Sequence, residues 1–509
     1  MKKLKKYIYS LFLGLVLFTS CDKGFDEMNV NPVQLTNVEA SFQLNNAIVG
    51  SAPTYGNLSY ETTIVKQMIT PFSGQGSAAN FNQDNRSVAA GNWTRYYRNV
   101  IRELVDVLQK TKDDPNNTNL YHTARIWKAY SFMILTDTYG DVPYIQAGQG
   151  YLEKLVKPAY DSQESIYTDI LKELETASAA LDASKPRVTR EVLYSGDISK
   201  WKRLGYALML RAAMRLSKVK PAIAAEYVAK AVSGGLMLSN DDNAIIRHTA
   251  NFVNDAGNQL NGGQSAFFYL AEDFVTYLKS NNDPRLASIA VRYVGATSGA
   301  NQNESRANRS PAVQVGMPLG YDNTTIPAIA TARGLATLWD FSQLDRTRMG
   351  NSQAPNFLVT YAQTQLLLAE AVIRGWTTGD ASVFYANGVR MHMKQLAGYG
   401  AASAVSDANI EGYIQANPLD MTKGLEQINT QYWAASFLNG PEAFANFRRS
   451  GFPVLTPNLY PGKDLKTEPF IRRITYPDAE RNVNNQNVQQ AINRQGPDIL
   501  DTRVWWDVK

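Results

Sequence analysis

Apolar residues recur along most of this chain at three- and four-residue intervals, the spacing of helices that turn one face to a core. Polar and turn-forming residues separate these stretches. Asp161 and Glu164 have capping-box spacing just before one of them. The pattern predicts a mostly α-helical protein, with helices in the segments 97–108, 121–138, 167–181, 201–212, 221–232, 357–374, 381–396 and 425–438.

The predicted helices come in pairs with short breaks between them. Tetratricopeptide-like proteins stack helix–turn–helix units in this way, and each unit buries its apolar face against the next. No clean 34-residue self-similarity recurs in the sequence. The pattern alone therefore fits a degenerate helix-pair superhelix and a non-repetitive helical domain equally well.

Residues 235–350 have a different texture. Gly, Asn, Ser and Pro become dense there, and strand-like pieces such as 288–294 are short. A long irregular region in a compact protein is usually functional when it is ordered, and binding residues concentrate on loops that a rigid scaffold carries. We interpret 235–350 and the segment 71–92 as loop excursions from one helical domain that spans 38–509.

The N-terminus has the features of a lipoprotein export signal. Four lysines lie within the first six residues, Leu11 to Phe18 is almost wholly apolar, and Cys21 follows two small residues. This order is typical of a signal peptide, and the apolar run is too short to span a membrane. We expect residues 1–20 to be cleaved, Cys21 to be acylated and 21–37 to form a polar tether. An ordinary signal peptide with an incidental cysteine is the alternative, since Phe18 stands where leucine is commoner.

Charge and cysteine content narrow the function classes. The 51 Lys and Arg residues include the four leader lysines and stand against 46 Asp and Glu, so the mature chain is nearly neutral. Such a chain has no electrostatic footprint for nucleic acid. Because Cys21 is the only cysteine, a disulfide and a cysteine-based metal site are both excluded.

Motifs for catalysis are missing. His122, His248 and His392 have no partner at metal-binding helical spacing, and the H-E-x-x-H, G-x-S-x-G, G-x-G-x-x-G and Walker A patterns are absent. The sequence therefore predicts no enzyme activity, no metal and no cofactor. A glycosidase needs only two suitably separated carboxylates, which no local motif marks, so a surface glycoside hydrolase stays as an alternative.

Aromatic residues in the polar loops are the candidates for ligand binding. A rigid ring beside amide and guanidinium donors suits a flat, polyhydroxylated ligand. The competing interpretation is that these rings anchor the loops to the core. Trp339 ranks first, because its indole offers the largest stacking surface and the neighbouring Asp340 can accept hydrogen bonds from hydroxyls. The candidates are Phe81, Asn82, Arg86, Tyr321, Trp339 and Phe341.

A series of motifs runs in order through the whole mature chain. They are Asn29–Pro32 (NVNP), 92–101 (NWTRYYRNVI), 135–144 (LTDTYGDVPY), 283–286 (DPRL), 369–371 (AEA), 448–453 (RRSGFP), 472–477 (RRITYP) with Glu480 and Asn482, and 504–507 (VWWD). Through these motifs the chain resembles the SusD/RagB family, the surface nutrient-binding lipoproteins of Gram-negative glycan-utilisation systems. Gln363 departs from the pattern, since an acid is expected after Tyr361-Ala362.

The resemblance implies four tetratricopeptide-like helix pairs with loop excursions, no catalysis, and a position as a lid on a TonB-dependent, SusC-like outer-membrane transporter. It assigns no ligand-contacting residue, because these vary within the family. We expect a lipid-anchored protein at the cell surface that captures an oligosaccharide and delivers it to the transporter. Peptide capture is the alternative within the family, and a purely structural lipoprotein is a further one.

Overall fold

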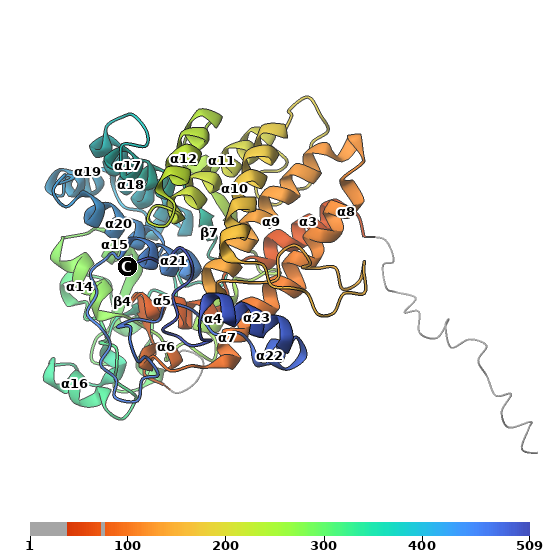
Figure 1. Ribbon diagram of the computed structural model, residues 1–509. Coiled ribbons are helices and arrows are strands. Elements are labelled where there is room, and N and C mark those ends of the chain that lie inside the picture. Colours follow the sequence, from red (N-terminus) through yellow and green to blue (C-terminus); the bar gives the residue numbers. More distant parts are fainter. Residues whose placement is uncertain (1–37, 73–76) are drawn as a thin grey trace, which may run out of the picture.

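The computed structural model describes residues 38–72 and 77–509, and most of the chain is helical (Figure 1). In the first half, successive helices pack side by side, each against the next along the chain from α8 to α12. The helix α3 packs against α8. The helices of this first group are α3 (Ala40–Gly50), α8 (Arg102–Thr111), α9 (Thr118–Tyr139), α10 (Gln163–Ala180), α11 (Ile198–Arg215) and α12 (Pro221–Gly234).

A second group of helices continues this frame. The helix α17 packs against α18 and α20, and also against α11 of the first group. The mostly helical, tetratricopeptide-like architecture is therefore confirmed. The second group consists of α17 (Tyr361–Ile373), α18 (Ala381–Gln395), α19 (Asp407–Ala416), α20 (Gly424–Ala435) and α21 (Gly440–Ser450).

The region between α12 and α17 is irregular, as its composition predicts. It holds α13 (Asp255–Asn261), α14 (Glu272–Ser280), α15 (Arg285–Ile289) and α16 (Ile326–Ala332). Its short strands pair antiparallel with one another and with one strand outside it, β1, in the orders β1–β3, β2–β7 and β5–β4–β6. The strands are β1 (Met68–Ile69), β2 (Ala244–Ile246), β3 (Tyr269–Leu270), β4 (Ala290–Tyr293), β5 (Ala307–Asn308), β6 (Gln343–Leu344) and β7 (Asn356–Val359).

Two local predictions were wrong. The segment 71–92, expected as a loop, contains α6 (Ser77–Phe81) and the start of α7 (Arg86–Arg95), which continues through a π-helical turn into α8. The cap of α10 is Ser162, whose hydroxyl accepts a hydrogen bond from the Ser165 amide, and not Asp161. Asp161 instead accepts hydrogen bonds from the backbone amides of Tyr144 and Ile145, both at 2.9 Å.

The remaining helices are α4 (Tyr55–Ser59), α5 (Glu61–Ile64), α22 (Asp478–Val483) and α23 (Asn485–Gln495).

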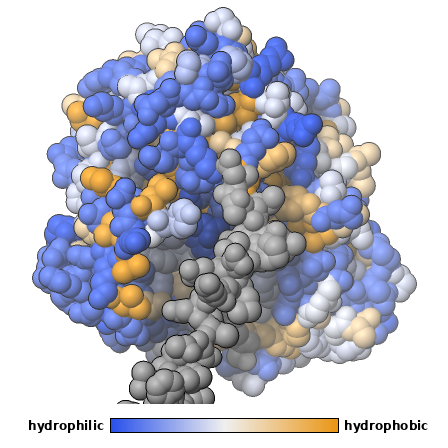
Figure 2. Space-filling view, turned by 90° about the vertical axis from the view of Figure 1, so that its right-hand side faces the viewer, coloured by the Kyte–Doolittle hydropathy of each residue, from blue (hydrophilic) through white to orange (hydrophobic). Residues whose placement is uncertain are grey.

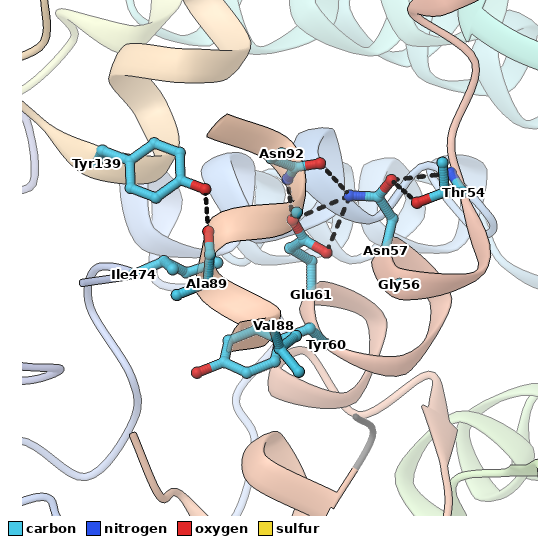
Figure 3. A pocket seen from close by; sticks show the side chains of 11 residues that line it. Thr54, Gly56, Asn57, Tyr60, Glu61, Val88, Ala89, Asn92, Tyr139 and Ile474 are labelled. Carbon is cyan, nitrogen blue, oxygen red and sulfur yellow. Dashed lines mark hydrogen bonds between the residues drawn. The ribbon is translucent and has the colours of Figure 1, made fainter. Parts of the chain in front are cut away.

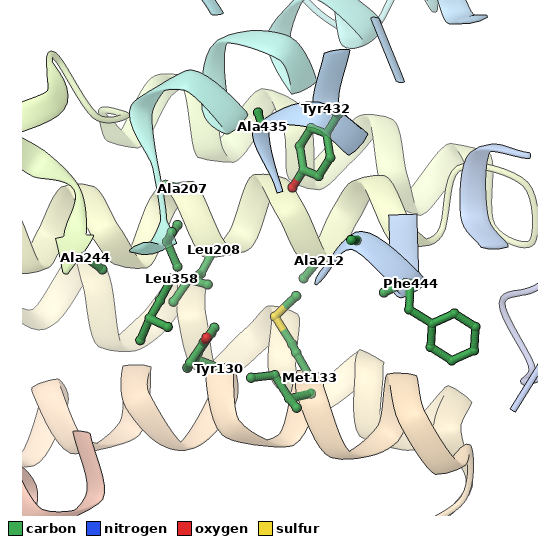
Figure 4. Close-up of a cluster of buried hydrophobic side chains, with 14 of the residues drawn as sticks. Tyr130, Met133, Ala207, Leu208, Ala212, Ala244, Leu358, Tyr432, Ala435 and Phe444 are labelled. Atoms are coloured by element: carbon green, nitrogen blue, oxygen red, sulfur yellow. The ribbon is translucent and has the colours of Figure 1, made fainter. Parts of the chain in front are cut away.

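The main apolar core lies between the helices of the frame. Figure 4 shows side chains of α9, such as Met133, beneath side chains of α11 and of the later helices, such as Leu208 and Phe444. A second, smaller cluster lies under the irregular region and includes Ile69, Tyr269 and Phe341. The irregular region thus has an apolar core of its own, which gives its loops a defined position.

Buried charges join the helices of the frame. Arg215 of α11 pairs with Glu442 of α21 at 2.6 Å and with Asp137 of α9 at 3.1 Å, and Arg211 lies 3.3 Å from Glu442. We call Asp137, Arg211, Arg215 and Glu442 the charge cluster. Burial raises the pKa of Glu442, but the two arginines bring it below its usual value. Glu442 therefore stays ionised inside the core, whereas burial raises the pKa of Asp137 despite its contact with Arg215.

A second buried pair connects α17 to α21. Arg449 donates two hydrogen bonds to Glu370, both at 2.7 Å, and Arg374 donates a third at 2.8 Å. Burial opposes ionisation of Glu370, but the two guanidinium groups lower its pKa to about 2. Similar pairs join Arg285 to Asp283, Arg473 to Asp498 and Arg472 to Asp507. The charged residues of the sequence motifs are thus largely structural.

The surface is polar. The face turned to the viewer in Figure 2 is mainly hydrophilic, with apolar residues in small separate groups. Within residues 38–72 and 77–509, we find no helix with the length and apolar character needed to cross a bilayer.

Replacing Glu370 tests how much these buried ion pairs contribute to the free energy of unfolding. Glu370→Ala should lower the free energy of unfolding by ~3–5 kcal/mol, because the Arg449 guanidinium would stay buried without its carboxylate. Chemical denaturation measures this loss. The matched control, Glu411→Ala, breaks the exposed Arg390–Glu411 pair and should change the unfolding free energy by less than ~1 kcal/mol. Equal losses in both variants would contradict the structural role of Glu370.

Candidate functional site

Three partly buried aromatic rings gather where the second apolar cluster and the main core come together. Phe72 stacks on Trp339 with ring centroids 5.4 Å apart, and Phe267 meets Phe72 edge-on at 4.9 Å. Phe72, Phe267 and Trp339 form what we call the aromatic trio. The rings come from segments far apart in the sequence, and each keeps part of its surface accessible. The accessible part of these rings can stack on a flat ligand.

Hydrogen bonds hold the backbone of Trp339 in place. It lies in the short 3-10 helix η7 (Leu338–Asp340), which Thr337 caps by accepting a hydrogen bond from the Trp339 amide at 3.1 Å. Gln302 donates a hydrogen bond to the Trp339 carbonyl oxygen at 2.8 Å. The position of the indole is therefore set by the loop itself rather than by a ligand.

Asp340 and Phe341, the two residues after Trp339, face inward. The Asp340 carboxylate pairs with Arg292 at 2.9 Å and accepts hydrogen bonds from the amides of Gly295 and Ala336, both at 3.0 Å. The expectation that Asp340 accepts hydrogen bonds from a ligand was wrong, because its oxygens are used inside the protein. Phe341 is fully buried in the second cluster. Its ring anchors the loop and offers no surface for stacking.

A groove of about 600 Å³ borders the irregular region. Ligand sites in proteins typically have ~300–1,000 Å³. It runs between α14, the segment 318–321 and the segment 453–459, and we call it the loop-face groove. Leu319 and Tyr321 line it and also pack against the cluster that holds Phe72 and Trp339. Residues that line the groove and two rings of the aromatic trio thus pack against the same apolar cluster.

The charges along the loop-face groove are paired. Lys66 lies 3.1 Å from Asp273, and Glu272 lies 2.7 Å from Arg333. Neither carboxylate is free to act alone as a general acid or base, and the groove carries no unpaired charge from these groups. A neutral ligand suits such a lining better than an ion.

The helix α6 positions Tyr321. Asn80 donates a hydrogen bond to the Tyr321 carbonyl oxygen at 3.0 Å and accepts one from the Gly320 amide at 2.8 Å. Phe81 is buried and stacks on Tyr460 at 4.3 Å, and the Asn82 carbonyl oxygen accepts a hydrogen bond from the Asp464 amide at 2.9 Å. Both candidates therefore contact the segment 460–464, which follows the groove-lining segment 453–459, and neither lines the groove.

Arg86 lies apart from the other candidates. Its guanidinium donates hydrogen bonds to Asp498 and to the Tyr476 carbonyl oxygen, both at 2.9 Å, and lies 3.2 Å from Asp84. These contacts join the start of α7 to the C-terminal segment. Of the six candidates, the structure brings Tyr321 and Trp339 to the accessible edge of one cluster. Phe267 lies in an apolar run, so sequence analysis does not rank it with them.

Glu61, a buried carboxyl outside the groove, has the raised pKa of a general acid, but the cavity beside it has no room for a substrate. Glu61 of α5 accepts hydrogen bonds from Asn92 at 2.6 Å and from Asn57 at 3.2 Å (Figure 3). Burial raises its pKa to about 7, against the opposing effect of these amides and of Arg95. The adjoining cavity has only about 30 Å³, enough for a water molecule and not for a substrate.

Over the part of the chain that the structure describes, no three His, Cys, Asp or Glu side chains gather as a metal site would require.

A comparison with protein families identifies the class. A SusD-like family model, described as starch-binding and associating with the outer membrane, matches residues 32–477. The chain belongs to this SusD-like family, and the resemblance seen in its motifs is confirmed. None of the curated proteins matches the chain.

Solved structures give the same result. A chitin-binding protein has 31% sequence identity and a TM-score of 0.82, covering 92% of this chain and all of its own. A protein described as Bacteroidetes AC2a SusD-like has 27% identity and a TM-score of 0.80, covering 93% of this chain and 100% of its own. A chitin-binding SusD homologue from Flavobacterium johnsoniae has 25% identity and a TM-score of 0.76, with 92% and 99% covered.

The raised pKa of Glu61 predicts a pH-dependent stability. Between the ordinary pKa of 4.5 and about 7, the folded protein holds a proton that the unfolded chain releases. The stability that protonated Glu61 contributes is therefore fully present below pH 4.5 and is lost as the pH rises through 7. Glu61→Gln removes this titration, so wild type should lose up to ~3 kcal/mol relative to the variant between pH 4.5 and pH 8.

Denaturation at several pH values measures the difference. The control Glu153→Gln changes an exposed carboxyl and should follow the wild-type curve. A difference between wild type and Glu61→Gln that does not change with pH would refute the assignment.

Proposed function

We propose that this protein captures an oligosaccharide on its loop face, holds it without cleaving it, and delivers it to a TonB-dependent transporter of the outer membrane. The observation that carries the proposal is a groove of about 600 Å³ with paired charges, whose lining residues Leu319 and Tyr321 pack against the same apolar cluster as two rings of the aromatic trio. Sugar rings present C–H faces that stack on aromatic rings, and their hydroxyls exchange hydrogen bonds with amides. Membership of a family described as starch-binding and outer-membrane-associated supports the same function.

A chitin-type chain is the ligand that we propose. Two of the similar solved structures are described as chitin-binding, one of them at 31% identity over 92% of this chain. Chitin chains are neutral, which suits the paired charges of Lys66 and Asp273 in the groove. Their flat rings offer a face to Phe72 and Trp339, and their acetamido groups suit amide partners.

Binding without catalysis agrees with the lining of the groove. Glu272 and Asp273 are its adjacent carboxylates, and each is engaged by a cation. A glycosidase needs one carboxyl with a raised pKa to protonate the leaving oxygen. Glu61, whose pKa burial raises to about 7, borders a cavity too small for a sugar.

The anchor is part of the proposal. Cys21 lies outside the described residues, and its acylation is inferred from the leader that precedes it. The described chain begins at the edge of the helical frame, where Lys110 of α8 donates a hydrogen bond to the Val38 carbonyl oxygen at 3.2 Å. More than one acyl chain gives stable attachment to a bilayer, so a lipidated Cys21 would hold the protein at the outer membrane.

The aromatic trio provides the test of glycan binding. Trp339→Ala should weaken binding of the chitin hexasaccharide by ~1–3 kcal/mol through lost apolar contact and leave the melting temperature nearly unchanged. Calorimetric titration and a melting curve measure the two quantities. Trp376→Ala is the matched control, since Trp376 is a partly exposed indole that contacts Arg374 on the helical frame.

Two results would count against this function. A loss of ~3–5 kcal/mol of stability with unchanged affinity would make Trp339 a core anchor. Release of shorter sugars that scales with protein concentration and survives repurification would make the protein a hydrolase. The recovered hexasaccharide should be intact by mass spectrometry.

Replacing Cys21 tests the anchor. Cys21→Ala should abolish incorporation of a radioactive fatty acid and leave the protein released or misprocessed, because no other thiol exists in the chain. Cys21→Ser, which keeps a small polar residue at the cleavage site, should behave in the same way. Equal labelling of wild type and both variants would refute acylation at this position.

A further inference from the structure

A smaller pocket adjoins the loop-face groove. It has a volume of about 260 Å³ and is lined by Tyr277, Tyr385 and Tyr413, which come from α14, α18 and α19. We call it the tyrosine pocket. Tyr277, Pro453 and Val454 line both the pocket and the groove, so the two are contiguous. In Figure 1 the helices α14, α18 and α19 lie on one side of the molecule, beside α20.

The hydrogen bonds beneath the pocket orient two of its hydroxyls. Gln431 of α20, itself buried, donates to the Tyr277 hydroxyl at 3.0 Å and to the Tyr413 hydroxyl at 2.9 Å. Its amide cannot turn over, because Arg285 donates a hydrogen bond to the Gln431 amide oxygen at 2.8 Å. Both phenol oxygens are therefore occupied as acceptors, and each has its own proton to donate.

At least one of these protons is available to a bound molecule. Only one of the two hydroxyls can give its proton to the other, and Tyr385 adds a third hydroxyl to the lining. Burial raises the pKa of Tyr277, Tyr385 and Tyr413, so all three stay protonated at physiological pH. The pocket thus offers hydrogen-bond donors on a fixed frame and favours a ligand with acceptor oxygens.

The charges around the pocket select against an ion. Arg285 is paired with Asp283 and also bonds to His392, so its charge is compensated inside the protein. Lys423 and Glu426 line the pocket with opposite charges. An ionic ligand would lose its hydration without gaining an uncompensated partner. The volume of the tyrosine pocket is close to ~300 Å³, the lower end of the range for ligand sites. A pocket of this size fits one sugar ring rather than a chain.

We propose that the tyrosine pocket binds the terminal ring of the oligosaccharide whose following rings lie in the loop-face groove. This inference rests on the proposed function, since it assigns one end of the same ligand. The ring is neutral and carries acceptor oxygens, such as an acetamido carbonyl or sugar hydroxyls, that receive the phenolic protons. The apolar surfaces of Pro453 and Val454 lie where the chain passes from the groove into the pocket. The protein would thereby recognise chain ends.

Two tyrosine variants test the pocket. Tyr413→Phe and Tyr385→Phe each remove a hydroxyl and keep the ring. Each should weaken binding of the N-acetylglucosamine monomer and of the chitin hexasaccharide roughly 5- to 10-fold, the equivalent of one neutral hydrogen bond. Ligand-observed NMR follows the monomer, and calorimetry follows the hexasaccharide. Tyr206→Phe, on α11 and outside both sites, is the matched control and should bind like wild type.

The comparison with Trp339→Ala separates this inference from the proposed function. Trp339→Ala should weaken hexasaccharide binding and leave monomer binding unchanged, because the monomer occupies only the pocket. Hexasaccharide binding that falls in Trp339→Ala but stays at the wild-type level in both tyrosine variants would overturn the pocket and keep the function. Wild type that binds neither sugar would overturn both. Tyr413→Phe leaves one Gln431 N–H without its acceptor, so Tyr385→Phe decides the case if Tyr413→Phe melts early.

Discussion

The charge cluster of Asp137, Arg211, Arg215 and Glu442 is the constraint on which the helical frame depends. Moving an ion into a protein interior costs several kcal/mol, and only close, well-oriented partners offset that cost. Here Arg215 meets Glu442 at 2.6 Å and Asp137 at 3.1 Å. The helices α9, α11 and α21 can therefore pack in only one rotation and register, because any slip would leave a buried charge alone.

Neutral groups extend this constraint to further elements. Tyr167 of α10 donates a hydrogen bond to Asp137, as does the Trp506 indole of the C-terminal segment at 2.9 Å. Tyr432 of α20 donates to Glu442 at 2.7 Å. Helices from both halves of the chain and its last residues thus meet at one point. The irregular region is inserted between α12 and α17, so its two ends are held by the same frame.

The sequence predicts the long helices well because their apolar spacing reports burial directly. It does not reveal the partners of the motif charges, since Asp137 and Arg215 are 78 residues apart and Arg215 and Glu442 are 227 apart. The short helices α6 and α7 lack an apolar stripe, which is why the segment 71–92 reads as a loop. Local composition therefore misses elements whose stability comes from tertiary contacts.

The candidate site shows the same limit more sharply. Trp339 and Phe341 lie two residues apart in one polar segment, yet Trp339 keeps accessible surface and Phe341 is fully buried. Composition cannot separate them, because the difference comes from the turn that Thr337 caps. Tyr277, Tyr385 and Tyr413 come from three helices, where an aromatic residue in sequence resembles ordinary core. Their convergence depends on the packing of α14, α18 and α19.

The bonded chain from Asp283 through Arg285 to Gln431 has a consequence for the kinetics of the proposed sugar binding. Because this chain holds the pocket in shape before any sugar arrives, little ordering entropy is lost on binding. In the proposed function, the residence time of a bound sugar would then depend on how fast its own contacts with the pocket break. In the proposed function, the protein would release its ligand at a rate set by these contacts alone, and the proposed transporter would have to accept the ligand within that interval.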